Sequence, residues 1–372
     1  MIYILSYYNH DSKNGGAYRL NSLAKYMSNI NRVDFFSLSI ESNFLGAIKY
    51  WKNAGILIKI WVLFNKIIFN AGLVLTKDPY YKRQALSYYN SKIKSTDTIV
   101  VSYPTIDDIL IGIEVMQRHK CKLNIDFRDY IFEFPLEKFS WLQKRRLKNL
   151  FKKIGDNDLV LVTAVSPPIC NSLKPYFKNV HCITNFRPLA DVSPVLLDLG
   201  KDIKVLYFGS ISDSFDRSSK ILFKAISLLA KKNKNKNFFF SFYGKYTKND
   251  ISSFNSLKDI RNLTLDYFEP ISENELGKYD FAILWGVPGN PGYVSSKFFS
   301  YLQLKVPIIA AAEGNQVGKY IDNFSVGYSY PFDKNVLIRG FSELENTKEL
   351  YNSDLTFFSN EYVLKKWSSI IL

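Results

Sequence analysis

A segment in the second half of the chain has residue types that suit a phosphate group. Residues 286–296 are rich in glycine and end in Ser295 and Ser296, and Lys297 opens a helical pattern. The first turn of a helix exposes free N–H groups and a partial positive charge, which favour an anion. We therefore predict a diphosphate site that includes Gly292, Ser295, Ser296 and Lys297. The alternative is an ordinary N-capped helix with a solvated lysine.

A second candidate phosphate contact follows the strand expected at residues 205–208. The polar loop that begins at Ser210 ends at Arg217, and Lys220 lies in the next helical segment. A guanidinium group can bind phosphate oxygens through two parallel hydrogen bonds, so Arg217 is a candidate and Lys220 a substitute. Arg217 could equally form a surface ion pair with Asp213 or Asp216.

Proton transfer needs a carboxylate or an imidazole, and the first half of the chain offers both. Asp126 and Asp129 end an apolar strand together with Arg128, and His10 lies in the polar loop after the first strand. Each of the three acid–base groups could deprotonate a hydroxyl group, and we expect Asp126 and Asp129 to face a cleft. The alternatives are a structural Arg–Asp pair at the strand end and an exposed histidine.

Two adjacent glycines complete the set of candidate residues. Gly15 and Gly16 end the polar loop at residues 9–16, and without a Cβ they let the backbone approach a ligand closely. A plain turn explains them as well. The three histidines have no ligand spacing, so we expect no metal site.

Parallel sheets must position these residues. Compact apolar runs predict strands, and helical periodicity between them predicts a doubly wound α/β fold built twice. We expect a first Rossmann-like domain at 1–190, a linker at 191–204 and a second at 205–345. A C-terminal helix at 346–372 could cross back to the first. The expected strands are 2–7, 98–103, 122–127 and 159–165, then 205–208, 238–243, 263–268, 281–285, 306–311 and 327–330.

Composition excludes several other protein classes. The chain has 372 residues, 47% of them hydrophobic, and only 3 cysteines, which argues against a disordered chain and a disulfide-stapled module. The formal net charge is +15, and residues 1–190 hold 27 basic and 14 acidic residues. The first half should therefore seek an anionic partner. We expect no signal peptide, because the apolar start of the chain is short, lacks a basic region and runs into polar residues.

Four ordered pieces resemble the GT-B glycosyltransferases, especially the bacterial group related to family 4. They cover nearly the whole chain. They are Gly15–Arg19 (GGAYR), Ile125–Asp129 (IDFRD), the stretch from Asp158 to Asn185, and Val205–Ser210 (VLYFGS) followed by the helical segment from Lys297.

The resemblance implies two Rossmann-like domains facing a cleft and sugar transfer from a nucleotide sugar. The expected acceptor is a hydroxyl group of a lipid-linked glycan or cell-surface polysaccharide, without a metal or other cofactor. It also places Glu269 and Ser272 near the nucleotide base, although Ser272 and Glu275 also read as a helix capping box. Many relatives carry two glutamates where this chain has Gly292 and Ser300.

Two other function classes compete with this interpretation. The missing glutamates motivate a non-catalytic glycan-binding protein or a scaffold of a membrane complex. A dinucleotide oxidoreductase is weaker, because the first glycine loop lacks the G-x-G-x-x-G pattern.

Two basic, apolar segments in the first domain predict contact with an anionic membrane surface. Residues 56–69 are strongly apolar, but Lys59 and Lys66 interrupt them, so a helix in the interface suits them better than a spanning helix. Residues 138–153 interleave lysine and arginine with Trp141 and leucines. The alternative for the first segment is a buried helix. The second segment could also bind nucleic acid, but no recognition motif is present, so we expect no nucleic-acid partner. The absence of a signal peptide and the two membrane-facing segments together predict a cytoplasmic enzyme, peripheral on the inner face of the cell membrane.

Overall fold

The structure is a computed structural model of the chain. It describes residues 1–6, 15–36, 56–134, 139–189, 193–209, 219–244, 248–268 and 278–372. The chain forms two compact units, one of Met1–Asn185 with Glu361–Leu372 and the other of Phe186–Asn360. Each unit has its own cluster of buried hydrophobic side chains.

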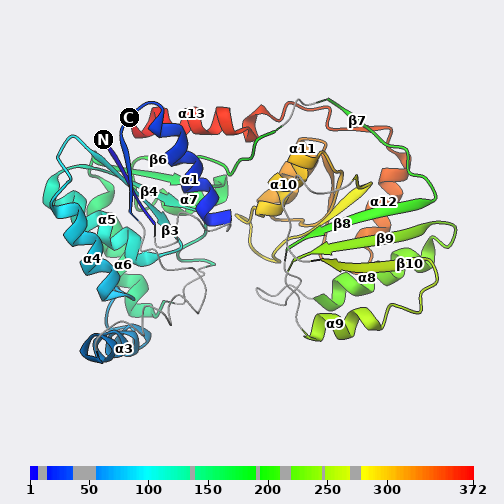
Figure 1. Cartoon of the computed structure of the whole chain (residues 1–372), viewed down its shortest axis with the longest axis horizontal. Coiled ribbons are helices and arrows are strands. Elements are labelled where there is room, and N and C mark those ends of the chain that lie inside the picture. The colour runs from blue at the N-terminus through cyan, green and yellow to red at the C-terminus, as the bar shows by residue number, and fades with distance from the viewer. Residues whose placement is uncertain are drawn as a thin grey trace. The chain divides into compact units, whose positions relative to one another are not determined.

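The first unit is built on a parallel six-stranded sheet in the order β2-β1-β3-β4-β5-β6 (Figure 1). Aliphatic runs such as Ile99–Val101 are fully buried, as expected where helices cover both faces. The strands are β1 (Ile2–Leu5), β2 (Val33–Phe36), β3 (Thr98–Tyr103), β4 (Lys122–Phe127), β5 (Val160–Ala164) and β6 (Val180–Cys182). The helices are α1 (Gly15–Ser28), α3 (Ile56–Asn70), α4 (Pro79–Asn90), α5 (Ile106–His119), α6 (Trp141–Gly155), α7 (Pro167–Leu173) and α13 (Asn360–Ile371).

The second unit has a parallel sheet in the order β10-β9-β8-β11-β12-β13. Helices α10 and α11 lie on one face of this sheet, and α8 and α9 lie on the other (Figure 1). The strands are β8 (Asp202–Phe208), β9 (Asn237–Tyr243), β10 (Leu263–Phe268), β11 (Phe281–Trp285), β12 (Ile308–Ala311) and β13 (Gly327–Tyr330). The helices are α8 (Ser219–Lys232), α9 (Lys248–Asn255), α10 (Ser296–Leu304), α11 (Gln316–Asn323) and α12 (Val336–Asn346). A small antiparallel pair, β7 (Val195–Leu196) with β14 (Glu349–Leu350), belongs to this unit.

In chain order the second sheet reads 3-2-1-4-5-6, the arrangement of a nucleotide-binding Rossmann fold. In such sheets the strand order reverses between the first and fourth strands, and ligands bind beyond the carboxyl ends of the strands there. Here these strands are β8 and β11. The fold topology therefore predicts a ligand site near Gly209, which follows β8, and near the segment that follows β11.

The sequence predictions of the fold are confirmed in class and incomplete in detail. Both doubly wound sheets form, and every predicted strand is present. The edge strands β2 and β6 were not predicted. The expected loop at residues 9–16 is wrong at its end, because Gly15 and Gly16 are the first residues of α1.

Candidate functional site

The strands β8 and β11 separate at the reversal of strand order. They pair through Val205 with Phe281 and Leu206 with Ala282. Beyond this point Tyr301, fully buried on α10, bridges the two strands: its hydroxyl accepts a hydrogen bond from the Phe208 N–H at 2.9 Å and donates one to the Ile283 carbonyl at 3.0 Å. Burial raises the pKa of Tyr301 far above its ordinary value, so the hydroxyl keeps the proton that it donates.

Lys297 projects from the start of α10 toward the carboxyl end of β8. Its Nζ lies 3.1 Å from the Tyr207 hydroxyl and 4.2 Å from the centre of the Tyr207 ring. A Cβ on Gly209, whose φ is +88°, would lie only 2.7 Å from Lys297 Cε. A glycine at position 209 therefore suits both the backbone conformation and the close approach of the lysine. The result is a half-buried cation beside the end of β8.

The segment after β11 is held in a defined shape. Asn315 accepts a hydrogen bond from the Val287 N–H at 3.1 Å and donates to the carbonyls of Val287 and Asn290 at 2.8 and 2.7 Å. Ser295 is the N-cap of α10, and its hydroxyl accepts a hydrogen bond from the Lys297 N–H at 3.3 Å. The start of α10 thus has a fixed orientation, with the residue types that suit a diphosphate.

The structure brings together part of the predicted phosphate site. Gly292 and Ser295 are buried, Ser296 is exposed and Lys297 is half-buried, all within one turn or loop of the start of α10. Lys220 is exposed on the first turn of α8. Ser210, Arg217, Glu269, Ser272 and His10 lie outside the described residues.

Asp126 differs from the expectation that it faces an open site. Its side chain is 0% exposed, and both carboxylate oxygens are engaged. Arg19 binds it through Nε and Nη2, both at 2.9 Å, and the Thr163 hydroxyl donates to it at 2.8 Å. This geometry corresponds to the structural alternative, an Arg–Asp pair at the strand end, although the arginine is Arg19 and not Arg128.

Asp129 lies two residues beyond β4 and is half-buried. Burial raises the pKa of its carboxyl group, and the neighbouring Arg128 opposes that rise. Arg128 is itself held by a hydrogen bond from Nε to the Tyr103 carbonyl at 3.1 Å. A carboxyl group with a raised pKa at the carboxyl end of a parallel strand has the properties of a general base.

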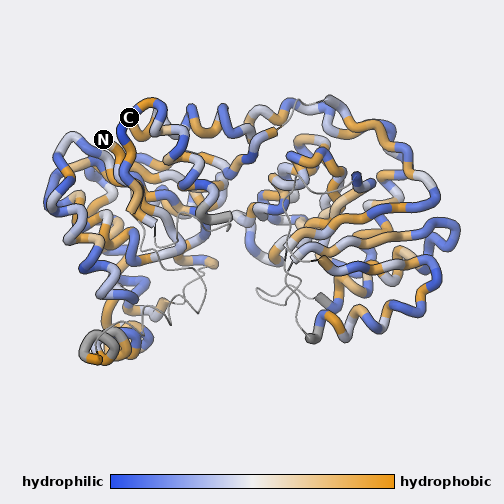
Figure 2. Tube along the Cα trace, viewed as in Figure 1, coloured by the Kyte–Doolittle hydropathy of each residue, from blue (hydrophilic) through white to orange (hydrophobic). Residues whose placement is uncertain are grey.

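Helix α3 is not the buried helix that we considered as an alternative. Its described side chains include six large apolar groups that are exposed, Ile56, Ile60, Trp61, Leu63, Phe64 and Ile67. Asn65 and Phe69 are the buried ones, and Lys66 is exposed. Figure 2 shows the hydrophobic character of this helix. In the part of the chain that the structure describes, no helix is long and apolar enough to cross a bilayer.

Full-length matches among solved structures bear on both units together. The lipopolysaccharide outer core galactosyltransferase WaaB matches 99% of this chain and 99% of its own, with a TM-score of 0.59 at 8% identity. The chain has the GT-B fold. A structure from Listeria monocytogenes described as a UDP-N-acetylglucosamine 2-epimerase also matches, with a TM-score of 0.59 at 9% identity over 99% of this chain and 94% of its own.

Another GT-B match covers less of its own chain. A TarM variant from S. aureus, solved in complex with fondaparinux, alpha-GlcNAc-glycerol and UDP, gives a TM-score of 0.51 at 14% identity. The match spans 78% of this chain and 59% of that one. No family model matches the sequence, and no curated protein matches it.

The sequence did not reveal the roles of several residues that shape the region around β8, β11 and the start of α10. Tyr207, Tyr301 and Asn315 contact partners 18 to 93 residues away in the chain, so no local pattern reveals them. Arg19 was noticed as part of a motif but without a role. Its place between apolar residues of α1 was the available signal, because an arginine there needs a buried partner.

Proposed function

We propose that the protein transfers a sugar from a nucleotide-sugar donor to a hydroxyl group of a glycan. The second unit would bind the donor diphosphate, and the first would present the acceptor. The observation that carries the proposal is the position of Lys297 beside Gly209, at the reversal of strand order where Rossmann sheets bind nucleotides. The full-length likeness to a galactosyltransferase supports it at the level of the fold.

In this proposal the described residues supply charge and proton transfer. The Lys297 ammonium and the N–H groups at the start of α10 would stabilise the negative charge that develops on the leaving diphosphate. Asp129 would accept the proton of the acceptor hydroxyl. The acceptor that we propose is a lipid-linked glycan or a polysaccharide.

Removing the Lys297 charge tests the donor site. In Lys297→Ala we expect kcat/KM for transfer to fall by roughly 10²- to 10³-fold, the range found for loss of one group that stabilises a developing anion. The thermal unfolding midpoint should stay close to wild type, because the side chain is half-buried at the surface of the unit. Lys319→Ala, an exposed lysine on α11, is the matched control. Wild-type turnover in Lys297→Ala would contradict the assignment.

A nucleotide-sugar panel tests the function itself. A nucleotide sugar that is a substrate should raise the unfolding temperature of the protein and release its nucleoside diphosphate when acceptor is added. If the protein converted the donor to an epimeric nucleotide sugar without an acceptor, its function would be epimerisation and not sugar transfer. No stabilisation by any nucleotide would favour a glycan-binding protein without catalysis.

We also propose that the first unit rests on an anionic membrane surface. The apolar side chains of α3 are exposed, and α6 carries exposed basic residues, among them Arg145, Lys152 and Lys153. Gln143 of α6 donates to the carbonyls of Phe69 and Val74 at 2.9 and 2.8 Å, which ties the two helices together at the end of α3. Apolar side chains beside cations suit the boundary between acyl chains and anionic headgroups.

Two substitutions on α3 test the membrane contact. Phe64 and Ile67 are 59% and 58% exposed, so each contributes roughly 1 kcal/mol on entering lipid, about half the value for a fully exposed side chain. Phe64→Ser/Ile67→Ser should therefore weaken binding to phosphatidylglycerol vesicles by about 30-fold in a flotation assay. Leu196→Ser/Ile251→Ser removes two exposed apolar side chains from the second unit as a control. Equal loss in both variants would contradict the role of α3.

A further inference from the structure

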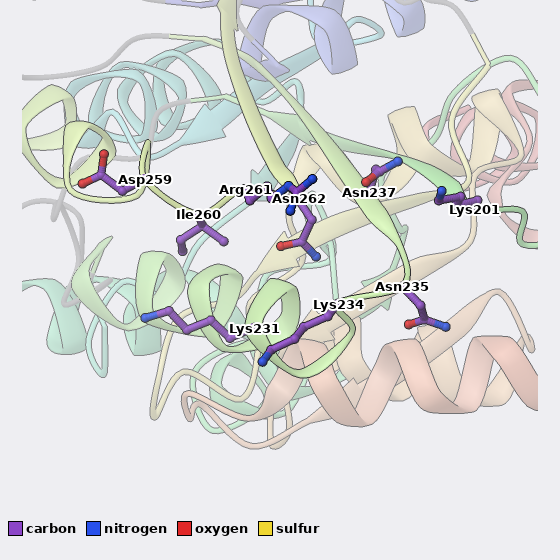
Figure 3. A pocket seen from close by; sticks show the side chains of 9 residues that line it. All are labelled: Lys201, Lys231, Lys234, Asn235, Asn237, Asp259, Ile260, Arg261 and Asn262. Atoms are coloured by element: carbon purple, nitrogen blue, oxygen red, sulfur yellow. The ribbon is translucent and has the colours of Figure 1, made fainter.

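The second unit contains a large pocket lined mainly by polar residues at the amino-terminal ends of strands β8, β9 and β10. Lys297 lies near the opposite, carboxyl-terminal end of β8. Its volume is about 800 Å³, within the range of ligand pockets. Three segments form it: the residue before β8, the stretch from the end of α8 to the start of β9, and the turn before β10. Figure 3 shows its lining residues, which are Lys201, Lys231, Lys234, Asn235, Asn237, Asp259, Ile260, Arg261 and Asn262.

Positive charge predominates in this pocket. Among the described residues that line it, four contribute cations (Lys201, Lys231, Lys234 and Arg261) and one, Asp259, contributes a carboxylate. All four cations are exposed, and none forms an ion pair with another residue in the ranges that the structure describes. Four cations with a single carboxylate among them repel one another, so an anion bound between them would be stabilised by all four.

The walls of the pocket are fixed by hydrogen bonds. Asn262 donates through Nδ2 to the carbonyls of Ala230, Asn233 and Lys236 at 3.0, 3.1 and 2.9 Å. These carbonyls lie at the end of α8 and just beyond it. The partial negative charge of the helix dipole at that end disfavours an anion. Because the Asn262 amide group donates hydrogen bonds to the carbonyls, it offsets part of that charge.

The segment before β8 is held in the same way. Lys236 Nζ donates to the carbonyls of Leu199 and Gly200, both at 3.1 Å, and lies 3.3 Å from a carboxylate oxygen of Glu345. These contacts fix the chain next to Lys201. The cations therefore project from a defined framework of three tied turns.

The residue types that line the pocket indicate which class of polyanion it could bind. The amide nitrogens of Asn237 and Asn262 donate to oxygens of the protein itself. The amide of Asn235 accompanies the cations, and amide groups hydrogen-bond well to sugar hydroxyls. The lining residues that the structure describes include no aromatic side chain, whereas single-stranded nucleic acids bind on aromatic side chains that stack with bases. Cations and amides without aromatic rings suit a chain of sugars that carries carboxylate or phosphate groups.

We propose that this pocket binds an anionic glycan, as a second glycan site remote from the donor site. This inference rests on the proposed function, because the glycan in the pocket would be the acceptor of the sugar transfer or its lengthened product. Between Lys201 of the pocket and Gly209 the chain runs eight residue steps along β8, about 26 Å at 3.3 Å per residue. A polymer held in the pocket is thus bound away from the transferred sugar, which would keep a growing chain on the enzyme between additions.

Fluorescence anisotropy with a labelled galacturonate oligosaccharide tests the proposal directly. The wild-type protein should bind it, and a neutral malto-oligosaccharide of equal length should not compete. Lys234→Gln/Arg261→Gln should weaken binding roughly tenfold or more, because it removes two charge-assisted contacts. Lys319→Gln/Lys334→Gln removes the same charge from exposed positions outside the pocket and should bind as wild type.

Three results would overturn the glycan assignment. Equal weakening in both double variants would mean attraction by net charge alone. Competition by inorganic phosphate at the same concentration as the oligosaccharide would identify a simple anion site. Tighter binding of a single-stranded RNA of equal charge would identify a nucleic-acid site.

The proposed function and this inference can fail separately. Binding of the oligosaccharide needs no turnover, so it should persist in Lys297→Ala. Stabilisation by a nucleotide sugar should persist in Lys234→Gln/Arg261→Gln. A protein that binds the oligosaccharide but no nucleotide sugar would retain the pocket assignment and lose the transferase assignment, and the opposite pattern would do the reverse.

Discussion

Replacing Asp126 by alanine should lower the free energy of unfolding of the protein by about 3–5 kcal/mol, the usual cost of removing one partner of a buried ion pair. The physical reason is that Arg19 remains in place, only 1% exposed, without its counter-charge. Its remaining acceptors are the carbonyls of Ile183 and Thr184, at 2.8 and 2.7 Å. Urea denaturation followed by circular dichroism measures the loss.

The double variant Arg19→Leu/Asp126→Leu separates charge from packing. Because it removes both charges, it should recover part of the stability that Asp126→Ala loses. The guanidinium group also stacks on Trp367 at 4.2 Å, so some loss should remain in the double variant. A loss below about 1 kcal/mol in Asp126→Ala would contradict the structural role that we assign to this carboxylate.

Replacing Asp129 by asparagine should have the opposite effect on stability and a severe effect on turnover. If Asp129 is the general base, transfer should fall by roughly 10²- to 10⁴-fold. Burial raises the pKa of Asp129 in the folded protein, so the folded state holds this proton more tightly than the unfolded state does. The stability that the group contributes is present in acid and is lost as the pH rises through the folded pKa.

Measurements across pH test both halves of this prediction. The free energy of unfolding of the wild type should fall as the pH rises above the ordinary range of an aspartate, and Asp129→Asn should flatten that fall and be more stable at neutral pH. The acidic limb of the activity profile should report the same raised pKa. An Asp129→Asn protein that is less stable than wild type and fully active would refute the assignment. Glu133→Gln, four residues further along the chain, is the matched control.

Much of the fold could be predicted because it depends on local composition. Strand β11 is a continuous apolar run and β3 has an aliphatic centre, as sheets covered on both faces require. The missed strand β2 has only four residues, is partly exposed and includes Asp34, so it carries little of this signal. Gly15 and Gly16 were assigned to a loop because glycine disfavours helices, yet they occupy only the first turn of α1.

The candidate sites were less predictable because their roles depend on distant contacts. Asp126 and Asp129 belong to one short motif, and only the fold shows that Arg19 reaches the first of them from more than a hundred residues away. Lys297 was predictable as a residue at a helix start. The separation of β8 and β11, which gives its position meaning, depends on Tyr301 and on strand pairing that no local window contains.

The last helix of the chain has a consequence for biosynthesis. Helix α13 belongs to the first unit, and within it Trp367 covers Arg19 and donates a hydrogen bond to Asn124 at 3.3 Å. The ribosome synthesises α13 after the whole of the second unit. The first unit therefore lacks Trp367 until α13 has been synthesised. A chain that stops before α13 leaves Arg19 and Asn124 without their contacts to Trp367, so we expect its first unit to be less stable than that of the longer chain.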